Sequence, residues 1–316
     1  MISQDKDLRK PNFFIIGAPK CGTTALASWL EEHPQIFFSP VKEPHYFSTD
    51  LRVSRIPEHD RYSALFSGVT HHHRAVGEGS VYYLFSKDAV RNIENYSKCQ
   101  AKYIVCLRNP VKMAPSFHWE QLFSGKEHIK PFAKAWAASD NRLQGKIVRR
   151  SYQDVRELAY KEVCKLGFQL ARLYNTIPRE RVHTVLLDDI ERDARLAYLS
   201  VLNFLGVDDD GRSHFDVKNP AKALRVRQLQ AVPQLLQRIK ESVGISKSFG
   251  FGGLIAKANK KVTPWPTLSD ELRLALEGHF REDILLLEHL LRRDLSHWFE
   301  HKPKTVPECG DPSLPG

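Results

Sequence analysis

A short segment near the N-terminus carries residues that could bind an anion. Gly17, Lys20, Gly22, Thr23 and Thr24 lie within Gly-Ala-Pro-Lys-Cys-Gly-Thr-Thr, between an apolar run and an amphipathic stretch. If the run is a strand and the stretch a helix, the loop directs backbone N–H groups and the positive helix end at a ligand. Lys20 adds a positive charge, and the two threonines add hydroxyl donors. The segment therefore predicts a phosphate-binding loop, with an ordinary strand-to-helix turn as the alternative.

The spacing of this loop departs from the Walker A pattern, G-x-x-x-x-G-K-[ST]. Thr23 follows the second glycine, and the lysine lies inside the loop at Lys20. A Walker loop needs its lysine at the β- and γ-phosphates and a hydroxyl on Mg²⁺. No clear acidic metal ligand follows a predicted strand. The sequence therefore favours a 5′-phosphate group bound without a metal ion.

The elements that position the loop alternate between strand and helix. Short apolar runs predict buried strands at 13–16, 103–107 and 182–187. Amphipathic spacing predicts helices from Thr23 to before Pro34, from 110 to about 123, and around 163–174. Such an alternation is typical of parallel βαβ units, whose ligands lie at the carboxyl ends of the strands. We therefore expect an α/β fold with a parallel sheet flanked by helices.

The second half of the chain is less regular. Residues 125–162 are rich in Lys and Arg and mostly helical in pattern, whereas 242–266 carry four glycines and two prolines and predict a loop. Apolar residues at three- and four-residue steps predict one helix over 270–298. The last residues, from 303 on, form a Pro/Gly-rich tail that we expect to be disordered.

Composition narrows the function classes. The 316 residues include 47 Lys+Arg and 37 Asp+Glu, a formal net charge of +10, which suits an anionic partner or cofactor. The hydrophobic fraction of 42% is that of a globular protein. No apolar run reaches the roughly 18 residues of a membrane-spanning helix, so no stable membrane anchor is expected. Five scattered cysteines without metal-ligand spacing favour a reducing, cytoplasmic setting.

Three segments together resemble a known family. They are the first loop, the run Lys42-Glu-Pro-His-Tyr-Phe47, and the run Leu107-Arg-Asn-Pro-Val-Lys-Met-Ala-Pro-Ser116. In this order they resemble the sulfotransferases that depend on PAPS (3′-phosphoadenosine 5′-phosphosulfate), and more closely the heparan-type and bacterial branch. The resemblance runs from about Pro11 to Trp298. It implies a P-loop nucleoside-kinase-like α/β fold, PAPS as donor, PAP as product and no required metal.

The resemblance also implies which residues contact the donor. The first loop would hold the 5′-phosphosulfate, and an Arg and a Ser eight positions apart, here Arg108 and Ser116, would hold the 3′-phosphate. A guanidinium binds phosphate bidentately, and a hydroxyl adds a donor. Lys261, or its neighbour Lys260, could reach the 3′-phosphate from the glycine-rich loop. The donor-binding residues expected in the first loop are Lys20, Cys21, Gly22, Thr23, Thr24 and Ala25.

Two side chains compete for the role of general base. Glu43 lies where the heparan-type enzymes place a catalytic carboxylate, and as a base it would take the proton of the acceptor hydroxyl. His45 is the alternative, because other branches use a histidine and an imidazole titrates near neutrality. Lys20 would stabilise the charge that builds on the leaving oxygen. The sequence favours Glu43 and leaves His45 open as a base or as an orienting group.

The chain also departs from the heparan-type pattern. Where that branch often carries Glu-Lys-Thr/Ser-Pro, this chain has Glu78-Gly-Ser-Val81, without the lysine and the proline. The late Lys-Gly-Arg phosphate clamp is replaced by Asn259-Lys-Lys-Val-Thr263. These differences argue against heparan as the substrate. They leave a hydroxyl, or an amine, of a carbohydrate, lipid or small metabolite as the acceptor.

The expected organisation is a single sulfotransferase domain over 11–300, after an extension of residues 1–10 and before a disordered tail of 301–316. Residues 125–162 and 242–266 would line the acceptor side. Cys21 lies beside Lys20 and near a helix N-terminus, conditions that lower a thiol pKa. A small-molecule or nucleotide kinase on the same fold is the first alternative, and a basic nucleic-acid-binding protein the second. The oligomeric state cannot be read from the sequence, and no nucleic acid is expected as partner.

Overall fold

The computed structural model describes residues 10–53, 55–144, 146, 154–216, 222–224, 260–262 and 268–299. The expected tail of 301–316, residues 1–9 of the expected extension, and all of the expected loop 242–266 except its short strand 260–262 lie outside the described residues. The division of the chain into extension, domain and tail therefore stays a prediction.

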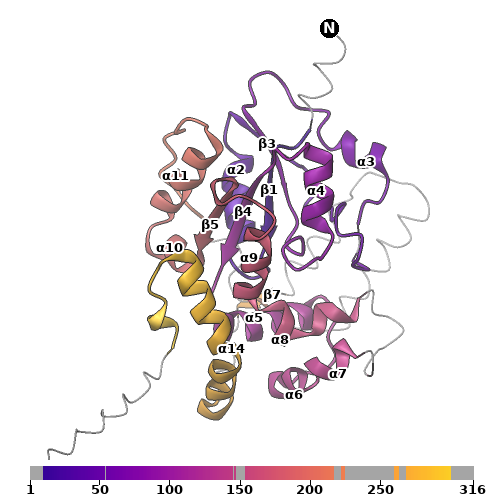
Figure 1. Ribbon diagram of the computed structural model, residues 1–316, viewed down its shortest axis with the longest axis vertical. Helices are drawn as coiled ribbons and strands as arrows, with labels where there is room; N and C mark the ends of the chain where they lie inside the picture. Colours follow the sequence, from indigo (N-terminus) through magenta and orange to yellow (C-terminus); the bar gives the residue numbers. More distant parts are fainter. Residues whose placement is uncertain are drawn as a thin grey trace, which may run out of the picture.

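A five-stranded parallel sheet forms the centre of the fold (Figure 1). Its strand order is β2-β3-β1-β4-β5, so the chain starts in the middle and builds outward on both sides. The predicted strands are confirmed as β1, β4 and β5, and β5 ends one residue earlier than expected because Leu187 begins α10. The strands are β1 (Phe13–Gly17), β2 (Ile36–Phe38), β3 (Ala75–Gly79), β4 (Lys102–Leu107) and β5 (Val182–Leu186).

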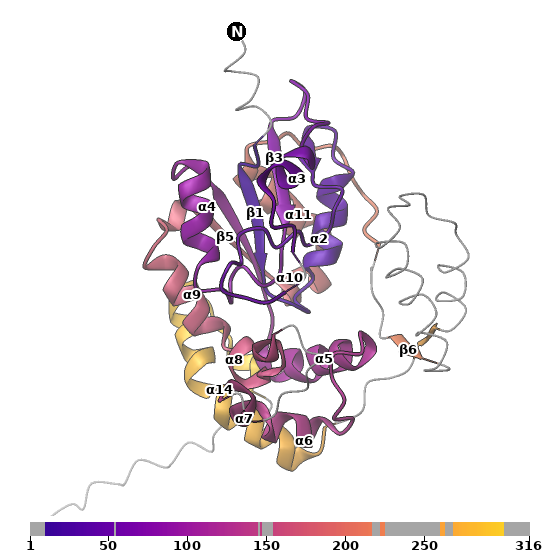
Figure 2. The same ribbon diagram turned by 90° about the vertical axis from the view of Figure 1, so that its right-hand side faces the viewer.

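Helices cover both faces of the sheet, which confirms the α/β fold class. In Figure 2, α4 and α9 lie on one face, and α2 and α11 lie on the other. Helix α14 runs beside α9 (Figure 1). These helices are α2 (Thr23–Glu31), α4 (Ala89–Ser97), α9 (Leu166–Tyr174), α10 (Leu187–Arg192), α11 (Ala194–Leu205) and α14 (Asp270–Leu291), with α3 (His59–Ala64) at the periphery.

A second group of helices lies beyond the carboxyl ends of the strands (Figure 2). Helix α5 (Pro110–Phe123) begins directly after β4, as predicted, and Asn109 caps it by accepting a hydrogen bond from the N–H of Val111. The predominantly helical pattern of 125–162 is confirmed only as short pieces in the described residues. They are α6 (Phe132–Ala137), α7 (Ser139–Leu143), η1 (Val155–Leu158) and α8 (Tyr160–Val163).

Two predicted helices are shorter than expected. The stretch 163–174 is divided, because Cys164 and Lys165 form a turn between α8 and α9. The helix expected over 270–298 ends at Leu291, where Arg292 adopts a left-handed φ of 50°. The chain then turns back and forms η4 (Ser296–Trp298). The helical spacing of apolar residues extends beyond Leu291 because Leu295, which follows the turn, is again buried in the core.

The core lies on both faces of the central strands. Phe13, Phe14, Ile15 and Tyr103 are at most 1% exposed, so β1 and β4 are buried along their length. A separate antiparallel pair joins β6 (Lys222–Leu224) and β7 (Lys260–Val262). Within the part of the chain that the structure describes, no helix combines the length and the apolar character needed to cross a bilayer.

Candidate functional site

The first loop leaves β1 and leads into α2 through two glycines with positive φ. Gly22 has a φ of 87° and directly precedes α2. A Cβ on Gly22 would lie 3.1 Å from Cδ1 of Leu187 and 3.3 Å from Cδ1 of Ile190. Only glycine adopts this conformation readily. The first N–H groups of α2 have no acceptor within the helix, and α2 has no acidic residue in its first turn.

The two predicted phosphate-binding groups lie together. Arg108 follows β4, and its Nη1 donates to the backbone oxygen of Lys20 at 3.1 Å. The same nitrogen lies 3.5 Å from Oγ of Ser116, which is on α5. The N–H of Ala18 donates to the oxygen of Cys106 at 2.8 Å and fixes the first loop to β4. Lys20 and Ser116 are 96 positions apart in the chain. The structure thus brings Lys20, Arg108 and Ser116 together at the carboxyl ends of β1 and β4.

Lys20, inside the first loop, and Lys42, which contacts it, both have partners in this structure. Nζ of Lys20 lies 2.6 Å from Oε2 of Glu120, one helical turn beyond Ser116 on α5. Nζ of Lys42 donates to Oγ1 of Thr24 at 2.9 Å. The Glu120 contact was not predicted, although its spacing of four from Ser116 places both on the same face of α5. An incoming anionic group would compete with Glu120 for Lys20.

The expectation of a low thiol pKa at Cys21 is wrong. Cys21 is fully buried, with its Sγ 3.4 Å from the oxygen of Pro19 and 3.9 Å from Sδ of Met113. Burial raises the pKa of Cys21 to about 12, more than the positive charges of Arg108 and Lys20 lower it. The thiol of Cys21 is therefore buried beneath the loop and stays protonated at neutral pH.

Glu43 and His45 form a pair beside the first loop. Oε2 of Glu43 lies 3.5 Å from Nε2 of His45. Burial opposes ionisation of Glu43, but the hydrogen bond with His45 and the charges of His45, Lys42 and Lys126 outweigh it and lower the pKa of Glu43. The Glu43 side chain is 32% exposed and that of His45 only 5%. Glu43 is therefore an ionised carboxylate that a ligand can reach, whereas His45 lies behind it.

Further polar residues around this pair were not singled out in the sequence, although Lys126 and Glu157 fall within 125–162, the segment expected on the acceptor side. The ring of Tyr82 lies 5.4 Å from that of His45, and its hydroxyl donates to Oε2 of Glu157 at 3.4 Å. Nζ of Lys126 lies 2.5 Å from the same Glu157 oxygen, and Nε2 of Gln121 donates to the Tyr82 hydroxyl at 3.3 Å. They come from the β3–α4 connection, from α5 and the residues after it, and from η1. No motif marked them because they are widely spaced in the chain.

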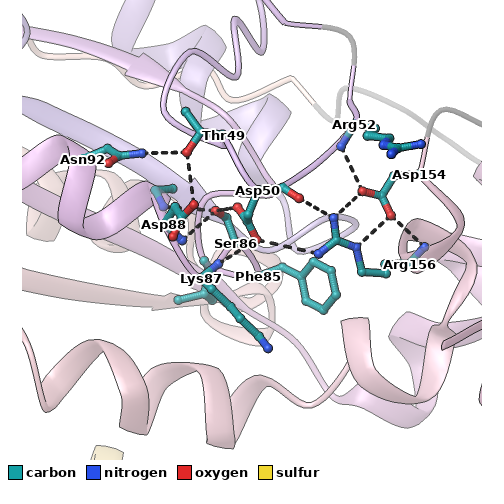
Figure 3. A network of polar contacts seen from close by, with 12 residues as sticks. Thr49, Asp50, Arg52, Phe85, Ser86, Lys87, Asp88, Asn92, Asp154 and Arg156 are labelled. Carbon is teal, nitrogen blue, oxygen red and sulfur yellow. Dashed lines mark hydrogen bonds and ion pairs between the residues drawn. The ribbon is translucent and has the colours of Figure 1, made fainter. Parts of the chain in front are cut away.

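A polar network holds the chain that continues from the Glu43 segment (Figure 3). Arg156 donates to the backbone oxygen of Asp50 and to Oδ2 of Asp154, and Oδ2 of Asp154 accepts the N–H of Arg52 at 2.9 Å. Asp50 also accepts a hydrogen bond from Ser86. The network joins residues 49–52 to the start of α4 and to η1, so the loop after Glu43 is fixed on two sides.

One expected phosphate contact involves a side chain outside the described residues. Lys261 lies in β7 and pairs with Ala223, but its side chain is outside the described residues, so a phosphate contact stays a prediction. Among the residues that are described, no three His, Cys, Asp or Glu side chains gather as a metal site. The structure thus brings together the loop that was predicted to bind an anion, the Arg108–Ser116 pair that was predicted to bind phosphate, and the carboxylate of Glu43.

Comparisons with known proteins find sulfotransferases. A crystallised sulfotransferase from Alicyclobacillus acidocaldarius is 27% identical, with a TM-score of 0.67 over 92% of this chain and 98% of that one. The membrane-associated sulfotransferase kil1 of Dictyostelium discoideum is 31% identical over 116 residues, 36% of this chain and 23% of that protein.

Human carbohydrate sulfotransferase 15 is 55% identical over 38 residues, which are 12% of this chain and 7% of that protein. The matches therefore span less than a quarter of these two curated relatives. The family model of the sulfotransferase domain matches residues 10–249, more than half of the chain. The chain therefore belongs to the sulfotransferase domain family.

Proposed function

We propose that this protein transfers the sulfuryl group of PAPS to a hydroxyl or amine of an acceptor and releases PAP. The observation that carries the proposal is the contact between Arg108 and the first loop, at 3.1 Å from the oxygen of Lys20. It joins the groups that the family resemblance assigns to the 5′-phosphosulfate and to the 3′-phosphate, which are carried by the same ribose of one donor. ATP lacks the 3′-phosphate that the family resemblance assigns to Arg108 and Ser116.

The residues present fit this donor. Gly22 has no Cβ to fill the turn, and Lys20, Thr23 and Thr24 offer a positive charge, hydroxyls and backbone N–H groups for the 5′-phosphosulfate. Arg108 and Ser116 would hold the 3′-phosphate by charge-assisted hydrogen bonds. When bound, PAPS supplies an activated sulfuryl group that the acceptor oxygen or nitrogen takes by in-line displacement.

The proposed role of Glu43 is to remove the proton of the acceptor. Its lowered pKa keeps it ionised at neutral pH, and its partial exposure lets an acceptor reach it. His45 is too buried to serve as the first proton acceptor and would orient Glu43 through the 3.5 Å contact. Lys20 would leave Glu120 and stabilise negative charge on the leaving phosphate oxygen. Cys21 and Ala25 would contribute packing and backbone to the loop.

The acceptor side is polar and carries positive charge. The positive charges of Lys42 and Lys126 both lower the pKa of Glu43. Nζ of Lys126 lies 2.5 Å from Glu157, and the Lys126 side chain is 41% exposed, so it would offer an acceptor a positive charge that the Glu78–Val81 run does not carry. This supports a hydroxyl-bearing acceptor such as a carbohydrate, a polar lipid or a small metabolite.

The proposal is tested with radiolabelled PAPS and a panel of an oligosaccharide, a long-chain alcohol, a phenol and an amine. We expect label on one acceptor class, without added metal. Glu43→Gln should lower turnover by about 10²-fold or more while PAP still binds. His45→Asn should lower it less. Wild-type turnover in Glu43→Gln would remove Glu43 as the base, and Mg²⁺-dependent phosphorylation from ATP would replace the proposed reaction with a kinase.

A further inference from the structure

The carboxylate of Glu78, near the end of β3, lies at the centre of a fully buried cluster. Glu78 is 0% exposed, and three hydroxyl groups donate to it. Oε1 accepts from Tyr83 at 2.7 Å and from Tyr62 at 3.3 Å, and Oε2 accepts from Ser80 at 2.9 Å. A buried carboxylate needs such partners, and each of these hydroxyl protons is thereby directed at Glu78.

Two of the same hydroxyl groups contact the segment that carries Glu43 and His45. Oγ of Ser80 accepts the backbone N–H of His45 at 3.0 Å, and the Tyr83 hydroxyl accepts that of Phe47 at 3.4 Å. A hydroxyl has one proton and two lone pairs. Because Glu78 takes both protons, the lone pairs of Ser80 and Tyr83 are free to face the backbone of this segment.

The segment needs external support. Glu43 has a φ of 54° and His45 a φ of 49°, and both are non-glycine residues in the left-handed region. Such conformations are unfavourable and persist only where the surroundings hold them. The N–H of Glu43 donates to the oxygen of Gly79 at 3.2 Å, so residues 43, 45 and 47 are all bonded to the end of β3 or the residues after it.

We propose that Glu78 is a positioning residue, which acts through Ser80 and Tyr83 to hold the backbone of Glu43–Phe47 in the geometry that proton transfer requires. The proposal rests on the proposed role of Glu43, although Glu78 itself touches neither acceptor nor donor. In this proposal the Glu78 carboxylate orients the hydroxyls of Ser80 and Tyr83, in addition to packing as any buried side chain does. These backbone hydrogen bonds involve protein atoms alone, so they can be tested separately from catalysis.

The first test is hydrogen–deuterium exchange of the full chain without donor. Glu78→Gln keeps the shape of the side chain but turns one acceptor into a donor, and Ser80→Ala removes one of the two bridges. We expect the backbone amides of Glu43, His45 and Phe47 to exchange at least tenfold faster in both variants. Glu94→Gln is the matched control, because Glu94 is also a mostly buried carboxylate, bonded to the Tyr103 hydroxyl at 2.7 Å. It should leave exchange at 43–47 unchanged.

The second test uses the acceptor that the PAPS panel identifies. Glu78→Gln and Ser80→Ala should lower kcat at least tenfold while the KM for PAPS and the Kd for PAP change less than threefold. The double variant should lose no more than about the worse single variant, because both changes break one chain of contacts. Glu94→Gln should retain the kcat of the wild type.

Unchanged exchange at 43–47 in both Glu78→Gln and Ser80→Ala would overturn the positioning role, whatever the protein transfers. Additive losses of kcat, or an equal loss in Glu94→Gln, would overturn it as well. If exchange rises as expected but PAPS neither binds nor turns over, the proposed function fails and the backbone support stands. The two failures are therefore distinguishable.

Discussion

Nζ of Lys20 lies 2.6 Å from Oε2 of Glu120, so the cation of the first loop is paired with a carboxylate of α5. The Lys20 side chain is 23% exposed and that of Glu120 is 50% exposed. A partly exposed pair of this kind is worth about 0.2–1 kcal/mol. Glu120 thus keeps Lys20 in the site while remaining easy to displace.

Glu120→Gln should tighten PAP binding, because the anion no longer competes with a carboxylate for Lys20. The expected gain is between about 1.5- and 5-fold, the affinity equivalent of the energy of one exposed ion pair. Titration calorimetry at low salt measures it, and the gain should shrink at high salt. Weaker binding in the variant would mean that Glu120 supports the donor site instead of competing for it.

Gly22→Ala should reduce both stability and PAP affinity. The φ of 87° costs a residue with a Cβ about 1–2 kcal/mol, and the new methyl group would press on Leu187 and Ile190. Gly206→Ala is the matched control, with a φ of 77° and no atom within 4 Å of the added Cβ. It should lower the melting temperature without changing PAP affinity. Equal PAP affinity in Gly22→Ala and the wild type would contradict the assigned role of the turn.

Glu78 should make stability depend on pH in an unusual direction. Burial raises the pKa of Glu78 from 4.5 to about 7, even though the hydroxyl donors lower it. Between these values the folded protein keeps a proton that the unfolded chain releases, so stability falls as pH rises from 4.5 to 7. The shift corresponds to about 3 kcal/mol at most.

Denaturant titrations of the wild type and Glu78→Gln between pH 4.5 and 7.5 isolate this effect, because the variant cannot titrate at residue 78. The stability of the wild type relative to the variant should decline across this window and level off above it. A difference that is constant with pH would show that residue 78 has the same pKa in the folded and unfolded states.

Arg142→Met should destabilise the fold strongly. Nη1 of Arg142 lies 2.8 Å from Oε2 of Glu127, and both side chains are at most 1% exposed. Removing one partner of a buried pair leaves an uncompensated charge and costs roughly 3–5 kcal/mol. Arg142→Met combined with Glu127→Gln should recover part of the loss. As a control, Arg91→Met removes an exposed pair with Asp88 and should cost less than about 1 kcal/mol. A similar loss of stability in Arg142→Met and Arg91→Met would contradict the expectation that the buried pair matters more than the exposed one.

The sequence predicted the elements with the strongest apolar patterns and missed those shaped by contacts. Strand β3 (Ala75–Gly79) contains two glycines and a glutamate, a poor strand pattern. Gly77 is required because a Cβ there would lie 2.3 Å from Cζ of Phe13 on the neighbouring strand. Such a constraint arises only once β1 and β3 are paired. Strand β2 has only three residues, too few for a periodicity to be seen.

The candidate site was predictable where its residues belong to short motifs. Lys20 follows from the loop motif, and Arg108 and Ser116 follow from the family resemblance; the structure brings the three together. Glu120 and Glu78 could not be recognised in this way, because their importance comes from a lysine 100 positions away and from hydroxyls on α3 and on the residues that follow β3. The thiol of Cys21 was misread because sequence shows the neighbouring charges but not the burial that outweighs them.

The central claim is that Arg108 and Ser116 recognise the 3′-phosphate of a PAPS-type donor held by the first loop. Calorimetric titration of the wild type and Arg108→Ala with PAP and with AMP, which lacks that phosphate, tests it most directly. A hydrogen bond to a charged group contributes about 1.5–3 kcal/mol. We predict that the wild type binds PAP at least tenfold more tightly than AMP, and that Arg108→Ala removes this preference while its affinity for AMP is unchanged. Equal affinity of the wild type for PAP and AMP, or an unaltered preference in Arg108→Ala, would contradict the account.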